Sequence, residues 1–146
     1  MANGEPMAVN PYLHYGGRCE EAIEFYTQTL GAELVTKMRY SEHPEPLPPA
    51  LKQMSPSELN KIMHAHLRIG SSTLMMSDGC PERSAKLQGF SIALTVAAVS
   101  DTEKLFSALA SGGTVVCPLR KTFFSPKFGM CKDRFGVPWT LIGAAS

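Results

Sequence analysis

Two histidines separated by one residue, His64 and His66, are the side chains of this sequence best placed to do chemistry together. Residues 62–69 alternate apolar side chains with polar ones, which predicts a β-strand with both imidazoles on one face. Residues two apart on such a face lie about 6 to 7 Å from each other, near enough to share a metal ion. A third ligand would have to come from Asp78 or from the proline-rich segment 40–61.

The same residues also have a simpler interpretation. His64 and His66 fit a row of solvated polar side chains that continues to Arg68. Ser77 and Asp78 could form an acid–base pair, but Asp78 followed by glycine also fits a strand end with a turn capped by its side chain. We favour the polar row and the turn.

Other reactive arrangements are missing from the sequence. The cysteines, Cys19, Cys80, Cys117 and Cys131, include no CxxC pair, which argues against a zinc ribbon or a thioredoxin-type motif. No nucleophile elbow is present, so covalent catalysis is unsupported. Four separate thiols and a polar N-terminal segment predict a cytoplasmic protein.

Size and charge narrow the function further. The chain has 146 residues, 44% of them hydrophobic, which favours one compact domain. The formal net charge of +1 lacks the cationic excess of nucleic-acid-binding proteins. No apolar run is long enough to span a bilayer, so neither nucleic acid nor membrane is an expected partner.

The elements that must position these side chains can be read from periodicity. An apolar stripe predicts a helix over 19–30, and a capping-box pattern predicts another that begins at Ser100 and ends before Gly112. A capping box at Ser55 predicts a short helical turn inside the proline-rich segment, which is either a lid or disordered. Strands are predicted over 9–15, 33–40, 62–69, 72–78, 90–96, 114–119, 127–132 and 137–142.

This order is β-α-β-β-β, repeated once. Phe25 and Gly31 in the first helix precede Phe106 and Gly112 in the second by the same number of residues. Duplication explains the pattern. When two half-sheets pair, they can bury apolar faces that neither half-sheet buries alone. We expect a disordered leader at 1–8 and one domain at 9–146, with modules at about 9–79 and 89–142.

Several stretches resemble the PhnB-like branch of the vicinal oxygen chelate superfamily, which includes glyoxalase I, bleomycin-resistance proteins and extradiol dioxygenases. The matching segments are 11–13, 25–26, 30–31, 64–69, 75–78 and 133–139. The resemblance implies an α+β fold in which two paired βαβββ modules form a curved mixed sheet around a cavity, with helices on the outer face. It also implies a homodimer.

Members of this superfamily hold a divalent metal on the first and last strands of each module. The equivalent positions here are Pro11, Ser91, Thr140 and either Met75 or Met76. None supplies an imidazole or a carboxylate, and lone hydroxyls are weak ligands. The usual metal centre is therefore expected to be absent, which leaves His64, His66 and Asp78 as fallback ligands.

The preferred hypothesis is metal-free binding of a small organic molecule in the cavity, with no cofactor. The alternative is a divalent-metal-dependent lyase or dioxygenase. The resemblance puts Pro11 towards the cavity, and His14 shares the opposite face with Tyr12. The candidate ligand-binding residues are Leu13, Tyr15, Met76, Ser91, Phe124 and Trp139, although aromatic residues in sheets are more often core.

Some relatives carry the name demethylubiquinone methyltransferase. A methyltransferase of that kind needs a glycine-rich loop between a strand and a helix to hold the nucleotide-like part of its methyl donor. The sequence has no such loop. Methyl transfer is therefore disfavoured.

Overall fold

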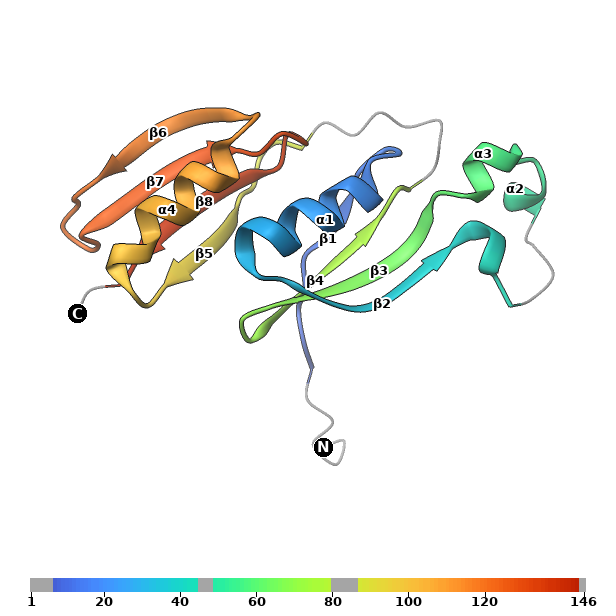
Figure 1. Ribbon diagram of the computed structural model, residues 1–146, viewed down its shortest axis with the longest axis horizontal. Coiled ribbons are helices and arrows are strands. Elements are labelled where there is room, and N and C mark those ends of the chain that lie inside the picture. The colour runs from blue at the N-terminus through green and yellow to red at the C-terminus, as the bar shows by residue number, and fades with distance from the viewer. Residues whose placement is uncertain (1–6, 45–48, 80–86, 145–146) are drawn as a thin grey trace. The chain divides into compact units, whose positions relative to one another are not determined.

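The computed structural model describes residues 7–44, 49–79 and 87–144. Most of the predicted leader, residues 1–6, lies outside this part of the chain, as does Cys80. The chain divides into two compact units, Met1–Ile23 with Ala32–Arg83, and Glu24–Gly31 with Ser84–Ser146. We describe each unit separately (Figure 1).

The first unit is built on a four-stranded mixed sheet of order β1-β4-β3-β2. Strands β2, β3 and β4 are antiparallel neighbours, whereas β1 pairs with β4 in parallel. A two-residue turn with Gly70 at a φ of 58° joins β3 to β4 as a hairpin. The strands are β1 (Tyr12–His14), β2 (Glu33–Arg39), β3 (Ile62–Ile69) and β4 (Ser72–Ser77).

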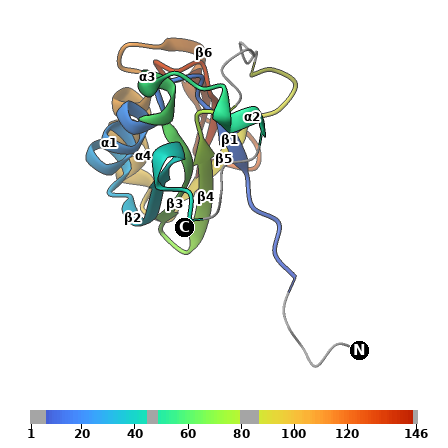
Figure 2. The same cartoon turned by 90° about the vertical axis from the view of Figure 1, so that its right-hand side faces the viewer.

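Strands β3 and β4 run side by side in both views (Figures 1 and 2). The start of helix α1 (Cys19–Leu30) belongs to this unit, and Arg39 of β2 contacts Glu20 in its first turn. The strand residues of one face are buried, as expected for the face under a helix. They are Leu13, Ala65, Leu67, Leu74 and Met76. The other face of the sheet is partly open and carries the polar alternates.

Short helical turns fill much of the described proline-rich segment. A 3-10 turn spans Tyr40–Glu42, and helices α2 (Pro49–Lys52) and α3 (Pro56–Leu59) follow. The capping box at Ser55 is confirmed: the Glu58 amide donates to Ser55 Oγ at 3.3 Å, and the Ser55 amide donates to Glu58 Oε1 at 2.9 Å. Residues 45–48 of this segment are not described.

The second unit repeats this plan with a sheet of order β5-β8-β7-β6, in which β5 is parallel to β8. Its elements are β5 (Ile92–Val96), α4 (Val99–Ala110), β6 (Thr114–Arg120), β7 (Lys127–Lys132) and β8 (Pro138–Gly143). Helix α4 packs on β7 and β8, where glycines allow close approach. A Cβ at Gly129 would lie 3.0 Å from the Phe106 ring.

The α+β class and the repeated βαβββ order are thus confirmed. One boundary was predicted wrongly: α4 begins at Val99, with Ala98 as the N-cap, so Ser100 lies within the first turn and makes no capping box. Among the described residues, no helix is both long enough and apolar enough to cross a membrane.

Candidate functional site

The open face of the first sheet gathers polar and aromatic side chains from adjacent strands. Strand register pairs Tyr12 of β1 with Met75 of β4, and Met75 with His66 of β3. His64 lies two residues before His66 on the same face. The side chain of Tyr12 is partly solvated, since 42% of this residue is exposed, and both histidines are half-buried.

Tyr12, His64 and His66 form a continuous hydrogen-bonded chain. The Tyr12 hydroxyl lies 2.9 Å from His64 Nδ1, and His64 Nε2 lies 2.7 Å from His66 Nε2. The two imidazole rings meet edge to face with centroids 4.5 Å apart. Two ring nitrogens at this separation need one proton between them, so one imidazole donates and the other accepts.

Burial changes the acidity of two members of this chain. Desolvation, followed by the proximity of His66, lowers the pKa of His64 below its usual value. Desolvation is also the main cause that raises the pKa of Tyr12. Both shifts favour the uncharged forms of Tyr12 and His64.

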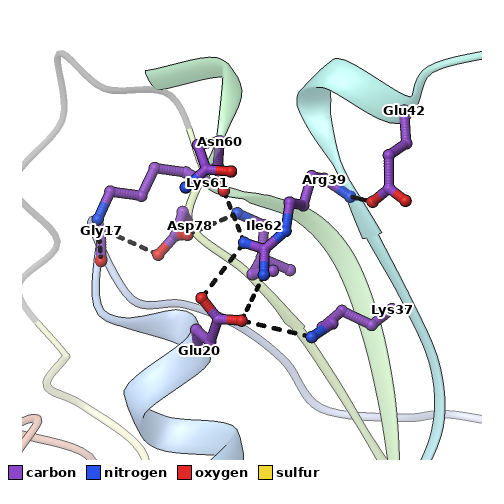
Figure 3. Close-up of polar contacts among 9 residues, drawn as sticks. All are labelled: Gly17, Glu20, Lys37, Arg39, Glu42, Asn60, Lys61, Ile62 and Asp78. Atoms are coloured by element: carbon purple, nitrogen blue, oxygen red, sulfur yellow. Dashed lines mark hydrogen bonds and ion pairs between the residues drawn. The ribbon is translucent and has the colours of Figure 1, made fainter. Parts of the chain in front are cut away.

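Asp78, a fallback candidate for a third metal ligand, makes other contacts (Figure 3). Its Oδ1 accepts hydrogen bonds from the amides of Gly17 and Cys19 at 2.8 Å each, and its Oδ2 accepts from the Ile62 amide at 2.8 Å. The carboxylate therefore caps the N-terminus of α1, where a negative charge is favourable. Within the described ranges, no group of three His, Cys, Asp or Glu side chains could hold a metal ion.

A neighbouring ionic cluster is structural (Figure 3). Arg39 of β2 contacts both carboxylate oxygens of Glu20 in α1, and Lys37 lies 3.3 Å from the same carboxylate. Arg39 also donates to the backbone oxygen of Asn60 at 2.7 Å. Hydrogen bonding to Arg39 is the main cause that lowers the pKa of Glu20. These contacts tie the helix to the edge strand.

The open face of the second sheet is different in character. Ser91 Oγ and Thr140 Oγ1 lie 2.7 Å apart and satisfy each other. The exposed ring of Phe124 packs edge to face on Phe128, with centroids 5.2 Å apart. Met130 pairs with Thr140 in register. This face offers hydroxyl, aromatic and thioether groups and no imidazole.

The structure places the predicted ligand-binding residues in two environments, the open face of the second sheet and the buried cores of the units. Ser91 and Phe124 lie on the open face of the second sheet. The other four, which belong to the buried cores of their units, are Leu13, Tyr15, Met76 and Trp139. In β1 the alternation is opposite to the expected one, because Tyr12 and His14 face outward while Leu13 and Tyr15 are covered.

Trp139 is buried in the core of the second unit and hydrogen-bonded to Asp133. Only 1% of the residue is exposed, and its indole Nε1 donates to Asp133 Oδ2 at 2.9 Å. The Tyr26 hydroxyl donates to the same oxygen at 2.5 Å, and its ring packs edge to face on the indole. Asp133 Oδ1 accepts the amides of Phe135 and Val137. This aspartate organises the core of the second unit.

Sequence reasoning did not select Tyr12 as a site residue. Strand β1 is only three residues long, too short for alternation to show which face is covered. The available signal was the polar character of Tyr12 and His14, which stack on each other with centroids 5.3 Å apart. Both residues had been placed on the face away from the site.

Comparisons with known proteins agree with this architecture. The sequence model described as "Glyoxalase/Bleomycin resistance protein/Dioxygenase superfamily" matches residues 8–141. Protein YjdN of Escherichia coli strain K12 is 36% identical over 139 residues, covering 92% of this chain and 94% of the relative. These matches span nearly the whole chain.

Two solved structures are similar along most of their length. The crystal structure of protein PA1353 from Pseudomonas aeruginosa has 39% identity and a TM-score of 0.83, and the match covers 97% of this chain and 100% of that one. A PhnB protein from Bacillus cereus, whose name also proposes 3-demethylubiquinone-9 3-methyltransferase activity, has 26% identity and a TM-score of 0.74. That match covers 94% of this chain and 100% of the relative.

Proposed function

The chain belongs to the glyoxalase/bleomycin resistance protein/dioxygenase superfamily, and on that premise we propose that it binds a small organic molecule without a metal ion. The observation that carries this proposal is the chemistry of the positions where the superfamily holds its metal. Ser91 and Thr140 donate and accept between themselves at 2.7 Å. In the first unit, Met75 pairs with Tyr12 in register on the open face and offers only a thioether, whereas Pro11 shares the opposite side of the strand with the covered Leu13.

These residues do not fit a divalent ion. Hydroxyl groups are weak ligands, and a thioether suits soft metals rather than the hard ions that carboxylates and imidazoles hold. The two candidate imidazoles, those of His64 and His66, are hydrogen-bonded to each other, and Asp78 caps a helix. A lyase or dioxygenase mechanism that depends on a divalent metal therefore lacks a suitable donor set among these residues.

The open sheet faces offer what an organic ligand requires. The first sheet combines hydrogen-bonding imidazoles with the Tyr12 ring and the Met75 thioether. The second sheet provides Ser91 and Phe124. Apolar surface with a few convergent polar groups is typical of small-molecule sites. We assign ligand contact to the residues of each open face taken by itself, and the buried Leu13, Tyr15, Met76 and Trp139 support the sheets from the covered side.

Methyl transfer is not part of this proposal. The name of the Bacillus cereus relative mentions such an activity, but the sequence here has no glycine-rich loop of the kind that holds a nucleotide-like cofactor. Ligand binding requires no such loop.

A thermal-shift screen of small aromatic and anionic metabolites tests the proposed function. At least one compound should raise the melting temperature in the presence of EDTA, because binding to the native state alone stabilises it. His66→Ala or Phe124→Ala should weaken the shift. A screen without hits, or hits that appear only after a divalent metal is added, would refute metal-free binding.

Element analysis of the purified protein provides a second, independent measurement. The proposal expects less than stoichiometric zinc, manganese, iron or nickel.

Lys52→Ala is a matched control for the thermal-shift screen, because this exposed residue lies in α2 and on neither sheet face. Its thermal shift with each hit should equal that of the wild type.

We also propose that the protein forms a homodimer through its edge strands. Strands β2 and β6 are edges of their sheets, and unpaired edges readily bind a second strand. Both expose apolar side chains: Leu34 and Val35 are 42% and 51% exposed, and Val115 and Val116 are 48% and 51% exposed.

Sedimentation equilibrium should give the mass of a dimer, and Val35→Lys or Val116→Lys should shift the measured mass towards that of the monomer. A wild-type monomer at micromolar concentration would exclude the dimer.

A cytoplasmic location is proposed from the thiols. The described cysteines, Cys19, Cys117 and Cys131, are free, and burial raises the pKa of Cys131 to about 11. Protonated thiols of this kind suit a reducing compartment. Fractionation of cells that express the protein tests this assignment, and recovery in an oxidising compartment would refute it.

A further inference from the structure

We propose that Tyr12, His64 and His66 form an acid–base site that accepts the proton of a weakly acidic hydroxyl group, phenolic or enolic, on the bound small molecule. This inference rests on the proposed ligand binding and adds the class of ligand. It begins from the observation that both ring nitrogens of His64 are engaged, one with Tyr12 and one with His66.

The hydrogen bonds among Tyr12, His64 and His66 allow two neutral arrangements of their protons. In one neutral arrangement, Tyr12 donates its hydroxyl proton to His64 Nδ1, and His64 Nε2–H donates to His66 Nε2. In the reverse arrangement, His66 Nε2–H donates to His64, and His64 Nδ1–H donates to the Tyr12 oxygen. His66 Nδ1 then carries a lone pair. Among the contacts of the described residues, no hydrogen bond to His66 Nδ1 is present, so this atom is the available proton acceptor.

The proposed step balances without another reactant. The O–H bond of the ligand breaks, and its electron pair stays on the ligand oxygen. The proton bonds to His66 Nδ1, and the resulting positive charge is shared with His64 through the hydrogen bond between their Nε2 atoms. The products are a ligand anion and a singly protonated imidazole pair, which attract each other across the open face.

The surroundings of the pair favour this exchange. The titratable groups that face the imidazole pair from β1 are Tyr12 and His14. By register, β2 places Thr36 and Met38, which do not titrate, beside the pair. The charged groups on this face of the sheet are Arg68 and Glu33, which pair with each other at 3.6 Å. In the described contacts, no carboxylate is hydrogen-bonded to either imidazole, so no anionic partner occupies the site of the proposed ligand anion.

The pair accepts one proton more readily than two. A first proton strengthens the hydrogen bond between the imidazoles, because charge-assisted bonds are stronger. A second proton would put two positive charges on rings whose Nε2 atoms lie 2.7 Å apart. An imidazole takes a proton readily only from a hydroxyl group that is itself weakly acidic, because proton sharing requires a donor and an acceptor of comparable strength. Phenols and enols meet this condition, whereas aliphatic alcohols do not.

The probe is 4-nitrophenol, whose phenolate absorbs at longer wavelength than the phenol. The purified protein is titrated into the probe at about pH 7, above the usual histidine pKa of about 6.5, where a free imidazole is mostly unprotonated. We expect the phenolate band to grow with protein concentration. His66→Asn should reduce this signal at least about tenfold, the equivalent of about 1.4 kcal/mol, and Tyr12→Phe should change it less. The methyl ether 4-nitroanisole should bind without a spectral change, because it has no acidic proton.

The outcomes separate the two proposals. Binding of 4-nitrophenol without added phenolate, or a phenolate band that His66→Asn leaves unchanged, overturns the acid–base site but not ligand binding. Failure of 4-nitrophenol to bind, while other compounds stabilise the protein in the thermal-shift screen, overturns the hydroxyl ligand class alone. A screen without any hit overturns the proposed function itself. Lys52→Ala, an exposed position in α2 that lies on neither sheet face, is the matched control and should keep the wild-type signal.

Discussion

The two sheets share a strand order but differ in the side chains on their open faces. In the first sheet, Tyr12, His64 and His66 form a hydrogen-bonded polar chain. In the second, the corresponding surface carries the Ser91–Thr140 hydroxyl pair and the Phe124 ring. The βαβββ plan therefore constrains the covered faces, where apolar packing is required, and leaves the open faces free to differ.

Each unit also depends on one buried aspartate, though in a different way. Asp78 accepts backbone amides from Gly17, Cys19 and Ile62, so it joins a loop, a helix start and a strand. Asp133 accepts two backbone amides and two side-chain donors. Buried carboxylates with this many donors stabilise a fold because each would be costly if left unpaired.

The largest effect should come from removing either aspartate. Asp78→Ala and Asp133→Ala leave several buried donors unsatisfied, so each should lower the free energy of unfolding by at least about 3 kcal/mol. Urea denaturation measures the loss. Asp78→Asn keeps one acceptor oxygen and should lose less. A loss below about 1 kcal/mol for either alanine variant would contradict the structural role.

A smaller effect is expected when only one donor to Asp133 is removed. Tyr26→Phe deletes the hydroxyl that lies 2.5 Å from Asp133 Oδ2 and keeps the packed ring. The predicted loss is about 1.5–3 kcal/mol, the range for hydrogen bonds to charged groups. Differential scanning calorimetry can measure it. Phe25→Leu changes a neighbouring ring without touching the carboxylate, and so separates packing from hydrogen bonding; an unchanged stability for Tyr26→Phe would contradict the assignment.

Ser91→Ala tests the open face of the second sheet. It removes one partner of a half-buried neutral hydrogen bond, so the free energy of unfolding should fall by only about 0.5–1.5 kcal/mol. Thr140→Val should produce a similar loss, and the double variant should lose less than the sum of the two. Full additivity in this cycle would show that the two hydroxyls do not interact.

The weakest expected effect is a pH dependence that distinguishes the first sheet from the second. The pKa of His64 is lowered in the folded state, so below about pH 6.5 the unfolded chain binds a proton that the folded chain resists. Stability should therefore fall as the pH decreases from about 7.5 to about 5.5. His64→Asn should flatten this part of the curve, whereas Ser91→Ala should not. Identical slopes for His64→Asn and the wild type would refute the shift.

Local patterns predicted the elements well where they were long or strongly capped. The alternation around His64 and His66 correctly located β3, and the Ser55 capping box correctly located the start of α3. The second capping box failed because Ser100 satisfies the pattern, yet the chain already turns into a helix at Val99. Capping depends on backbone conformation at one residue, which a four-residue pattern does not determine.

The candidate site was less predictable for the same reason. The pairing of His64 with His66 followed from their spacing, but the participation of Tyr12 depends on how β1 lies beside β4. The expected role of Asp78 as a metal ligand competed with a turn, and neither interpretation anticipated a cap on a helix about 60 residues earlier in the chain. Such contacts join segments whose separation carries no periodic signal.

What the sequence alone determined is the duplicated βαβββ order, since it depends on residue type and on spacing along the chain. Tertiary structure decided which face of β1 is covered and which donors the buried aspartates receive. It also decided that Tyr12 completes the imidazole chain. The physical reason is that hydrogen bonds and burial depend on distances in space, and strand pairing brings together residues that the chain keeps far apart.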